Sequence, residues 1–191
     1  MNPTTDFAEG YIRFLEGNLV YLRPVEVEDA ANYYKILYQP DVRRLTGTQA
    51  IFTLSQVTAY LESKGGDSSS ILLWIAVRDT NEHIGDIAFQ DIDRNNRSAN
   101  IRIAINGDEH QGKGYGSEAL RLLLDYGFGI LNLHRIELNV FSYNGRALHV
   151  YEKLGFVREG VQRDALYYNH AYHDSIMMSL LEDEYRMQLI D

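Results

Sequence analysis

A glycine-rich turn between an expected strand and an expected helix constrains this chain more than any other feature of its sequence. Residues 111–116 read QGKGYG, with glycine at alternate positions. Glycine adopts backbone conformations that other residues avoid, so successive amide N–H groups of such a turn can point at one centre. The start of the following helix adds partial positive charge at the same place. The turn therefore predicts a site for a phosphate or pyrophosphate group.

Two nucleotide-binding motifs fit this turn poorly. The dinucleotide fingerprint has the spacing G-x-G-x-x-G, whereas the glycines here follow G-x-G-x-G. A P-loop needs a serine or threonine directly after its lysine, but Gly114 follows Lys113. The turn also comes after several expected strands rather than after the first strand of a parallel sheet. A plain strand-to-helix turn remains the other interpretation.

The hydrophobic pattern predicts a mixed α/β (α+β) fold around one sheet, with an antiparallel meander between residues 71 and 105. We expect strands at residues 19–23, 71–77, 83–90, 99–105, 136–140, 156–161 and 173–180. We expect helices at 27–37, ended by Pro40, at 54–64, capped by Ser55, and at 115–130 and 144–153. Residues 1–17 are expected to form a leader with a short helix at 7–14. The 191 residues suit one domain, 1–191.

A second segment, residues 144–156, reads NGRALHVYEKLGF. Asn144 and Tyr151 are seven residues apart, so on a helix they share one face about 10 Å apart along the axis. Asn144 has two equal interpretations, as a helix N-cap or as an amide that contacts a ligand. Tyr151 by itself reads as a core tyrosine on an amphipathic helix.

Taken together, these two segments resemble the Q/R-x-x-G-x-G/A and N-x-x-A-x-x-x-Y-x-x-x-G-F motifs of the GNAT N-acetyltransferase superfamily. The resemblance covers roughly residues 19–185 and is closest to the branch of ribosomal-protein N-terminal acetyltransferases and spermidine acetyltransferases. It implies a single GNAT-like domain whose mostly antiparallel sheet is splayed around a CoA site and flanked by helices. It also implies transfer of acetyl from acetyl-CoA to a primary amine of a small molecule or a protein N-terminus.

The resemblance implies a set of cosubstrate-binding residues. The turn amides would hold the pyrophosphate of CoA, and the strand backbone would pair with the pantetheine amides. The implied residues are Gln111, Gly112, Lys113, Gly114, Tyr115 and Gly116 in the turn, Ile103, Ala104 and Ile105 on the strand, and Asn144 and Lys153 on the later helix. The side chains of Lys113 and Lys153 either reach CoA phosphates or remain solvated surface charges.

Tyr151 is the predicted general acid. An amine that attacks a thioester expels a thiolate, and a phenol with a pKa near 10 can protonate that sulfur. The amine must itself lose a proton, and no single base stands out. Glu28, Asp86, Asp91 and a water held by the backbone all remain open.

Composition excludes several classes of chemistry. The chain has no cysteine, which removes disulfides, thiolate metal sites and a cysteine nucleophile, so direct attack in a ternary complex is expected rather than an acetyl-enzyme. The net charge of −9 argues against nucleic-acid binding. The histidines complete no metal site. No apolar run approaches the ~20 residues of a membrane span, and the start lacks a signal-peptide pattern, so a cytoplasmic location is expected.

Two further expectations concern partners. Residues 41–53, DVRRLTGTQAIFT, hold one acid and two arginines, so a polyamine would lack carboxylate partners there. Tyr167, Tyr168 and Tyr172 in the last hairpin favour a homodimer, because exposed aromatic side chains are common at interfaces. The rival function from another class is a non-catalytic CoA-binding or sensor module, which would not need Tyr151.

Overall fold

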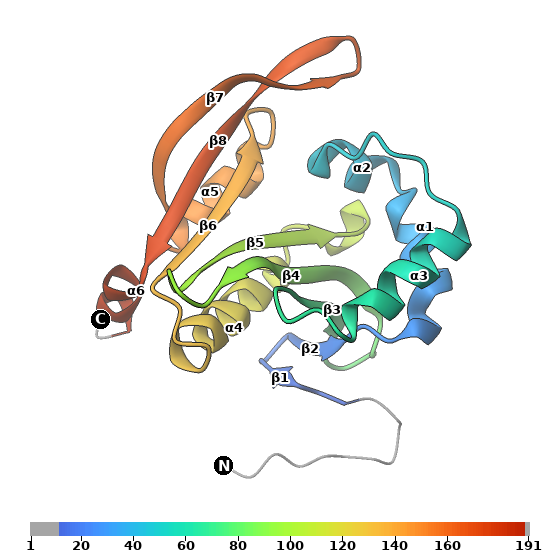
Figure 1. The fold of residues 1–191 in the computed structure, drawn as a ribbon, viewed down its shortest axis with the longest axis horizontal. Coiled ribbons are helices and arrows are strands. Elements are labelled where there is room, and N and C mark those ends of the chain that lie inside the picture. Colours follow the sequence, from blue (N-terminus) through green and yellow to red (C-terminus); the bar gives the residue numbers. More distant parts are fainter. Residues whose placement is uncertain (1–11, 190–191) are drawn as a thin grey trace.

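The computed structural model describes residues 12–189, which are built around one eight-stranded sheet in the order β1-β2-β3-β4-β5-β6-β8-β7 (Figure 1). Only β5 and β6 are parallel, which confirms the expected mostly antiparallel sheet. The strands are β1 Leu15–Glu16, β2 Val20–Pro24, β3 Ile71–Val77, β4 His83–Asp93, β5 Ser98–Ile105, β6 Arg135–Phe141, β7 Val157–Tyr168 and β8 Ala171–Leu181.

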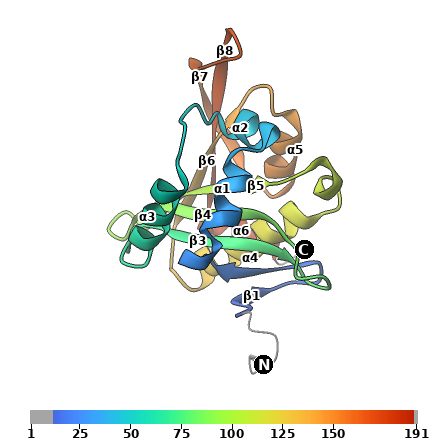
Figure 2. The ribbon, with the colours of Figure 1, turned by 90° about the vertical axis from the view of Figure 1, so that its right-hand side faces the viewer.

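Helices cover both faces of the sheet (Figure 2). They are η1 Val27–Asp29, α1 Ala30–Leu37, α2 Pro40–Thr46, α3 Leu54–Lys64, η2 Asp108–His110, α4 Tyr115–Gly129, α5 Gly145–Lys153 and α6 Glu182–Gln188. Alternate residues of β3 show the two layers. Leu73 and Ile75 belong to the core under α4 and α5, whereas Trp74 belongs to the core under α1, α2 and α3. The mixed α/β fold is thereby confirmed.

The sheet opens between β5 and β6. The two strands pair at only three positions, Ser98 with Arg135, Ala99 with Ile136 and Asn100 with Glu137. Beyond these pairs the strands diverge (Figure 1), while β5 stays paired with β4 as far as Ile105. Residues 101–105 therefore have a partner strand on one side and none on the other within the described part of the chain.

Several element boundaries differ from the sequence expectations. Pro40 begins α2 instead of closing a helical region, because its missing N–H costs nothing at the first helical position. Thr53, not Ser55, caps α3, and its Oγ1 accepts from the Gln56 amide at 3.2 Å. Most of the helix expected at 7–14 lies outside the described residues, and residues 12–14 lead into β1 without helix.

The last two strands are longer than expected because a tight turn joins them. Asn169 and His170 both have positive φ, 51° and 64°, the conformation that suits a two-residue hairpin. The exposed ring of Tyr167 contacts that of Tyr172 across the hairpin, with centroids 5.0 Å apart. Among residues 12–189, no helix is long and apolar enough to cross a membrane.

Candidate active site

The glycine-rich turn has the backbone geometry that its sequence predicts. Gly112 and Gly114 have φ of 75° and 88°, the left-handed region that favours glycine. Gly114 is the N-cap of α4, and no side chain caps this helix end. The first intrahelical bond runs from the Glu118 amide to the Gly114 carbonyl at 3.0 Å. The amides of residues 115–117 therefore have no acceptor within the helix and remain free to bind an anion.

The open edge of β5 presents backbone groups beside this turn. The Asn106 amide donates to the Ile84 carbonyl of β4 at 2.7 Å. Because successive residues of a strand point their polar groups to opposite sides, Ala104 also points toward β4. Ile103 and Ile105 point their N–H and C=O groups toward the open edge. Of the three predicted backbone positions, Ala104 is the one whose polar groups face away from that edge.

Two glycines support this arrangement. A Cβ atom on Gly85 would collide with the Ala104 carbonyl oxygen, so that oxygen does face β4. A Cβ atom on Gly116 would lie 3.6 Å from Ile105 Cγ1 and 3.8 Å from Ile103 Cδ1. The first turn of α4 thus packs directly against the part of β5 that has lost its partner strand. The free helix amides and the free strand groups line one region.

α5 carries the other two predicted side chains. Asn144 is the N-cap of this helix, and its Oδ1 accepts from the Ala147 amide at 3.2 Å. The Nδ2 group of Asn144 has no hydrogen-bond partner among residues 12–189, so capping leaves a donor available. Both interpretations of Asn144 are therefore compatible with the geometry.

Tyr151 is 8% exposed and packs edge-on against Phe156, with ring centroids 5.8 Å apart. Burial raises the pKa of its phenol to about 12. The hydroxyl has no hydrogen-bond partner within the described part of the chain. A protonated, unengaged phenol has the chemistry of a proton donor to a thiolate.

One contact joins the turn to α5. Arg146 donates a hydrogen bond from Nη1 to Oε1 of Gln111. Sequence reasoning missed Arg146, although an arginine two residues after an N-cap, with no acid nearby on the helix, is a signal for anion binding. Lys113 and Lys153 are exposed and form no ion pair within residues 12–189.

The three carboxylates considered as a base lie in different surroundings. Asp86 is 2% exposed and forms an ion pair with Arg102, whose Nη2 also lies 3.4 Å from the Tyr33 hydroxyl. Burial raises the pKa of Asp86, against the opposing effect of Arg102. Glu28 and Asp91 are both exposed. Asp86 therefore has a structural partner, and none of the three is brought to Tyr151 by a contact.

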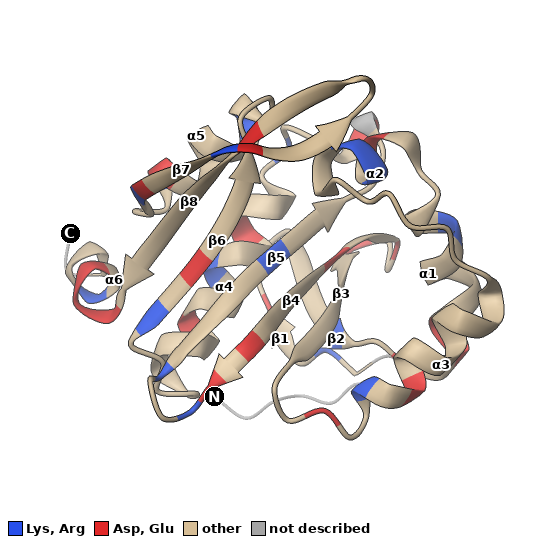
Figure 3. Cartoon of the chain, turned by 45° about the horizontal axis from the view of Figure 1, so that its top comes forward, with Lys and Arg blue, Asp and Glu red and all other residues tan. Residues whose placement is uncertain are grey.

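α2 carries two arginines (Figure 3). Aromatic rings and backbone carbonyls hold both side chains in place. Arg43 donates to the Ala50 carbonyl at 3.0 Å and lies over the Tyr38 ring. Arg44 lies over the Tyr143 ring, 5.8 Å from its centroid, and its carbonyl accepts from the Tyr143 hydroxyl. α2 is thus fastened to the loop between β6 and α5. Both arginines are engaged in packing the fold.

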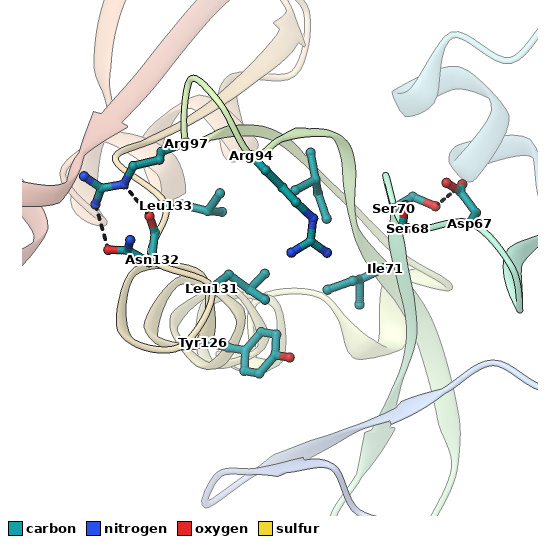
Figure 4. A pocket seen from close by; sticks show the side chains of 11 residues that line it. Asp67, Ser68, Ser70, Ile71, Arg94, Arg97, Tyr126, Leu131, Asn132 and Leu133 are labelled. Atoms are coloured by element: carbon teal, nitrogen blue, oxygen red, sulfur yellow. Dashed lines mark hydrogen bonds between the residues drawn. The ribbon is translucent and has the colours of Figure 1, made fainter.

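A cavity of about 480 Å³ lies elsewhere (Figure 4). It is lined by Arg94, Tyr126 and Leu131, among others, at the C-terminal end of α4. A 15-residue helix is about 22 Å long, so this cavity is remote from the turn at the other end. None of the residues predicted to bind the cosubstrate or to act on it lines the cavity.

A sheet that opens beside an uncapped, glycine-rich helix start is the arrangement that the sequence resemblance implies for an acyl-CoA-dependent transferase. The chain belongs to the GNAT acetyltransferase family, because residues 20–157 match the model of the acetyltransferase (GNAT) domain. It is an acetyl-CoA-dependent N-acetyltransferase.

Relatives and solved structures agree with this assignment. The chain is 30% identical to the spermidine N(1)-acetyltransferase of Escherichia coli K12, over 87% of this chain and 88% of that protein. It also resembles the crystal structure of the Vibrio cholerae spermidine N-acetyltransferase in complex with CoA and spermine, with a TM-score of 0.83, 28% identity, and coverage of 89% and 99%. A dodecameric structure of that enzyme gives a TM-score of 0.77 at 27% identity, covering 88% and 97%.

Proposed function

We propose that this chain binds acetyl-CoA where β5 loses its partner strand, and that it acetylates a primary amine in a ternary complex. The pyrophosphate would lie on the amides of the 111–116 turn, and the pantetheine arm along Ile103 and Ile105. The observation that carries the proposal is the packing of Gly116 directly on those two isoleucines. It brings the phosphate-binding amides and the open strand edge within reach of one extended ligand.

The proposed reaction needs one proton donor and one proton acceptor. The amine nitrogen attacks the thioester carbon, a C–N bond forms, and the C–S bond breaks. Tyr151 donates its phenolic proton to the departing thiolate, and the proton of the attacking amine passes to water or a carboxylate. No residue of the chain becomes acetylated, in keeping with the absence of cysteine.

For the acceptor, we propose a small polyamine of the spermidine type as the first candidate. The Escherichia coli relative, whose match covers 87% of this chain, is named for spermidine, and one solved structure holds spermine. The arginines of α2, which argued against a polyamine in the sequence, are bound to aromatic rings and carbonyls. These partners are neutral, so both arginines keep their charge, and the polyamine proposal rests on the relatives and the solved structure. A protein N-terminus remains the second candidate.

Release of free thiol from acetyl-CoA tests the acceptor. Spermidine, spermine, a simple alkylamine and a peptide with a free N-terminus are compared, and the acetylated product is identified by mass spectrometry. We expect the polyamines to give the highest kcat/KM. Thiol release that needs no amine, or none with any amine, would contradict transfer by this chain and favour the CoA-binding module.

The same proposal includes a homo-oligomer in which the exposed β7–β8 hairpin contributes to the interface. Tyr167 and Tyr172 are 50% and 64% exposed, and Val161 on the outer strand is 56% exposed. Light scattering at micromolar concentration that gives the mass of one chain would contradict it. The assignment of residues 1–191 to one domain and the cytoplasmic location stay predictions.

A further inference from the structure

Glu118 binds a turn that lies about one hundred residues earlier in the chain. Its carboxylate accepts hydrogen bonds from the backbone amides of Asn18, Leu19 and Val20, at 3.0, 2.7 and 2.8 Å. The Asn18 and Leu19 amides belong to the connection between β1 and β2, and Val20 is the first residue of β2. Three backbone donors bind one carboxylate strongly, because a hydrogen bond to an ionised group is stronger than one between two neutral groups.

The turn is shaped to receive this carboxylate. A Cβ atom on Gly17 would lie 2.6 Å from Cδ of Glu118, so a larger residue would push the carboxylate away. Gly17 does not have a positive φ. Space for the Glu118 side chain, and not backbone conformation, is therefore what requires glycine at position 17.

The contact reaches the phosphate-binding turn through Leu19. A Cβ atom on Gly114 would lie 3.4 Å from Cδ1 of Leu19, so the Leu19 side chain packs beside the N-cap of α4. Glu118 is in the first turn of the same helix. The carboxylate thus fixes the start of α4 to β2, while Leu19 supports the glycine that begins the helix.

The same contact also reduces the electrostatic repulsion between Glu118 and a bound phosphate. A carboxylate in the first turn of a helix is stabilised by the helix dipole, but an unpaired one would repel an incoming phosphate. Here the three amides of residues 18–20 bind the carboxylate. The amides of residues 115–117 stay free for an anion.

We propose that Glu118 is a positioning residue for acetyl-CoA, which holds the 111–116 turn and the start of α4 in the geometry that binds phosphate. The proposal rests on the proposed location of the pyrophosphate. Glu118 touches neither the thioester nor the amine, so its loss should weaken cosubstrate binding and leave the chemical step unchanged.

The test compares Glu118→Gln and Gly17→Ala with Arg121→Ala, an exposed residue of α4 that serves as control. Gln keeps one acceptor oxygen but turns an N–H₂ group toward backbone donors. Alanine at position 17 displaces the Glu118 carboxylate from the side of the β1–β2 connection, and the sequence of α4 stays unchanged. For both variants we expect Kd and KM for acetyl-CoA to rise about tenfold, as for one lost charge-assisted hydrogen bond. We expect kcat to stay within about twofold of wild type.

Two further measurements distinguish the possible outcomes: amide hydrogen exchange, and acetyl-CoA binding by the Gly114→Val variant. Faster amide exchange at residues 112–117 in both test variants, together with the rise in KM, supports the positioning role. A Kd for Glu118→Gln equal to that of wild type overturns it, provided that Gly114→Val abolishes binding. If Gly114→Val binds acetyl-CoA normally, the proposed phosphate location itself fails. A fall in kcat with unchanged KM also contradicts the positioning role.

Discussion

Arg146 on α5 donates a hydrogen bond to Gln111 in the turn before α4. The two residues stand 35 positions apart, and each belongs to one of the two motifs that the sequence singles out. Their contact spans the region between the turn amides and the helix that carries Tyr151. Gln111 is uncharged, so the guanidinium has a neutral partner and keeps its full charge for an anion.

Arg146→Ala should weaken acetyl-CoA binding because a cation beside the phosphate-binding turn is lost. We expect Kd to rise about fivefold to tenfold, roughly 1–1.4 kcal/mol. Calorimetry at low and at high salt measures the change in Kd. Lys153→Ala is the comparison, because Lys153 belongs to the last turn of the same helix. A larger loss for Lys153 than for Arg146 would show that the phosphates lie at the other end of α5.

Tyr151→Phe should lower kcat and leave the acetyl-CoA Kd and the melting temperature nearly unchanged. General acid catalysis is typically worth about 10²–10⁴-fold, and about tenfold is the smallest loss we expect because a CoA thiolate leaves readily. Steady-state and single-turnover rates measure the change. Activity that falls only in step with the melting temperature would make Tyr151 a packing residue.

The raised pKa of Tyr151 gives this prediction a pH signature. Since burial raises the pKa to about 12, the phenol stays protonated throughout an ordinary assay range. A fall in kcat between pH 8 and pH 10 would belong to another group, and it should persist in Tyr151→Phe. Its disappearance in that variant would contradict the assignment.

Asp86→Ala should destabilise the fold, because it leaves the Arg102 guanidinium without its buried partner. We expect a loss of about 3 kcal/mol in the free energy of unfolding, measured by urea denaturation. Asp91→Asn, at an exposed position whose φ of 52° asparagine tolerates, should change stability little. The double variant Asp86→Leu with Arg102→Met should recover most of the loss. Wild-type kcat in that double variant would also remove Asp86 from the candidates for the base.

Gly85→Ala should disrupt the pairing of β4 with β5, because the added Cβ meets the Ala104 carbonyl oxygen. Overpacking of this kind costs about 1–3 kcal/mol. Gly129→Ala is the matched control: nothing lies within 4 Å of its Cβ, and it ends α4 without positive φ. Thermal unfolding should show the first variant below wild type and the second at or slightly above it. Equal melting temperatures for the two variants would contradict the close contact at Gly85.

Individual strands and helices of this fold could be predicted from the sequence, because each depends on the pattern of residues that are neighbours along the chain. The apolar run Ile71–Val77 is bounded by turn residues and became β3 without a shift. The periodic run after Gly114 became α4, and Asn144 caps α5. Alternation along β5 correctly placed Arg102 on the opposite face from the isoleucines.

The remaining features depend on residues that meet only in the folded chain. Nothing in the sequence of β5 or β6 says that their pairing stops at Asn100 and Glu137, since both strands continue with ordinary strand residues. The partners of Glu118 are backbone amides, which leave no side-chain signature. The contact of Arg146 with Gln111 likewise joins two segments whose spacing along the chain is not periodic.

Three residue pairs join β5 to β6, and the Arg97 carbonyl just before β5 also accepts hydrogen bonds from the His134 and Arg135 amides. Strands β1 to β5 all precede residue 106, and β6 to β8 all follow residue 134. Cleavage of the chain at the exposed Ile130 would therefore give two fragments with unbroken strands, held together by the shared apolar core around α4. The glycine-rich turn would lie on one fragment and Tyr151 on the other, so acetyl transfer by a mixture of the two would measure their reassembly.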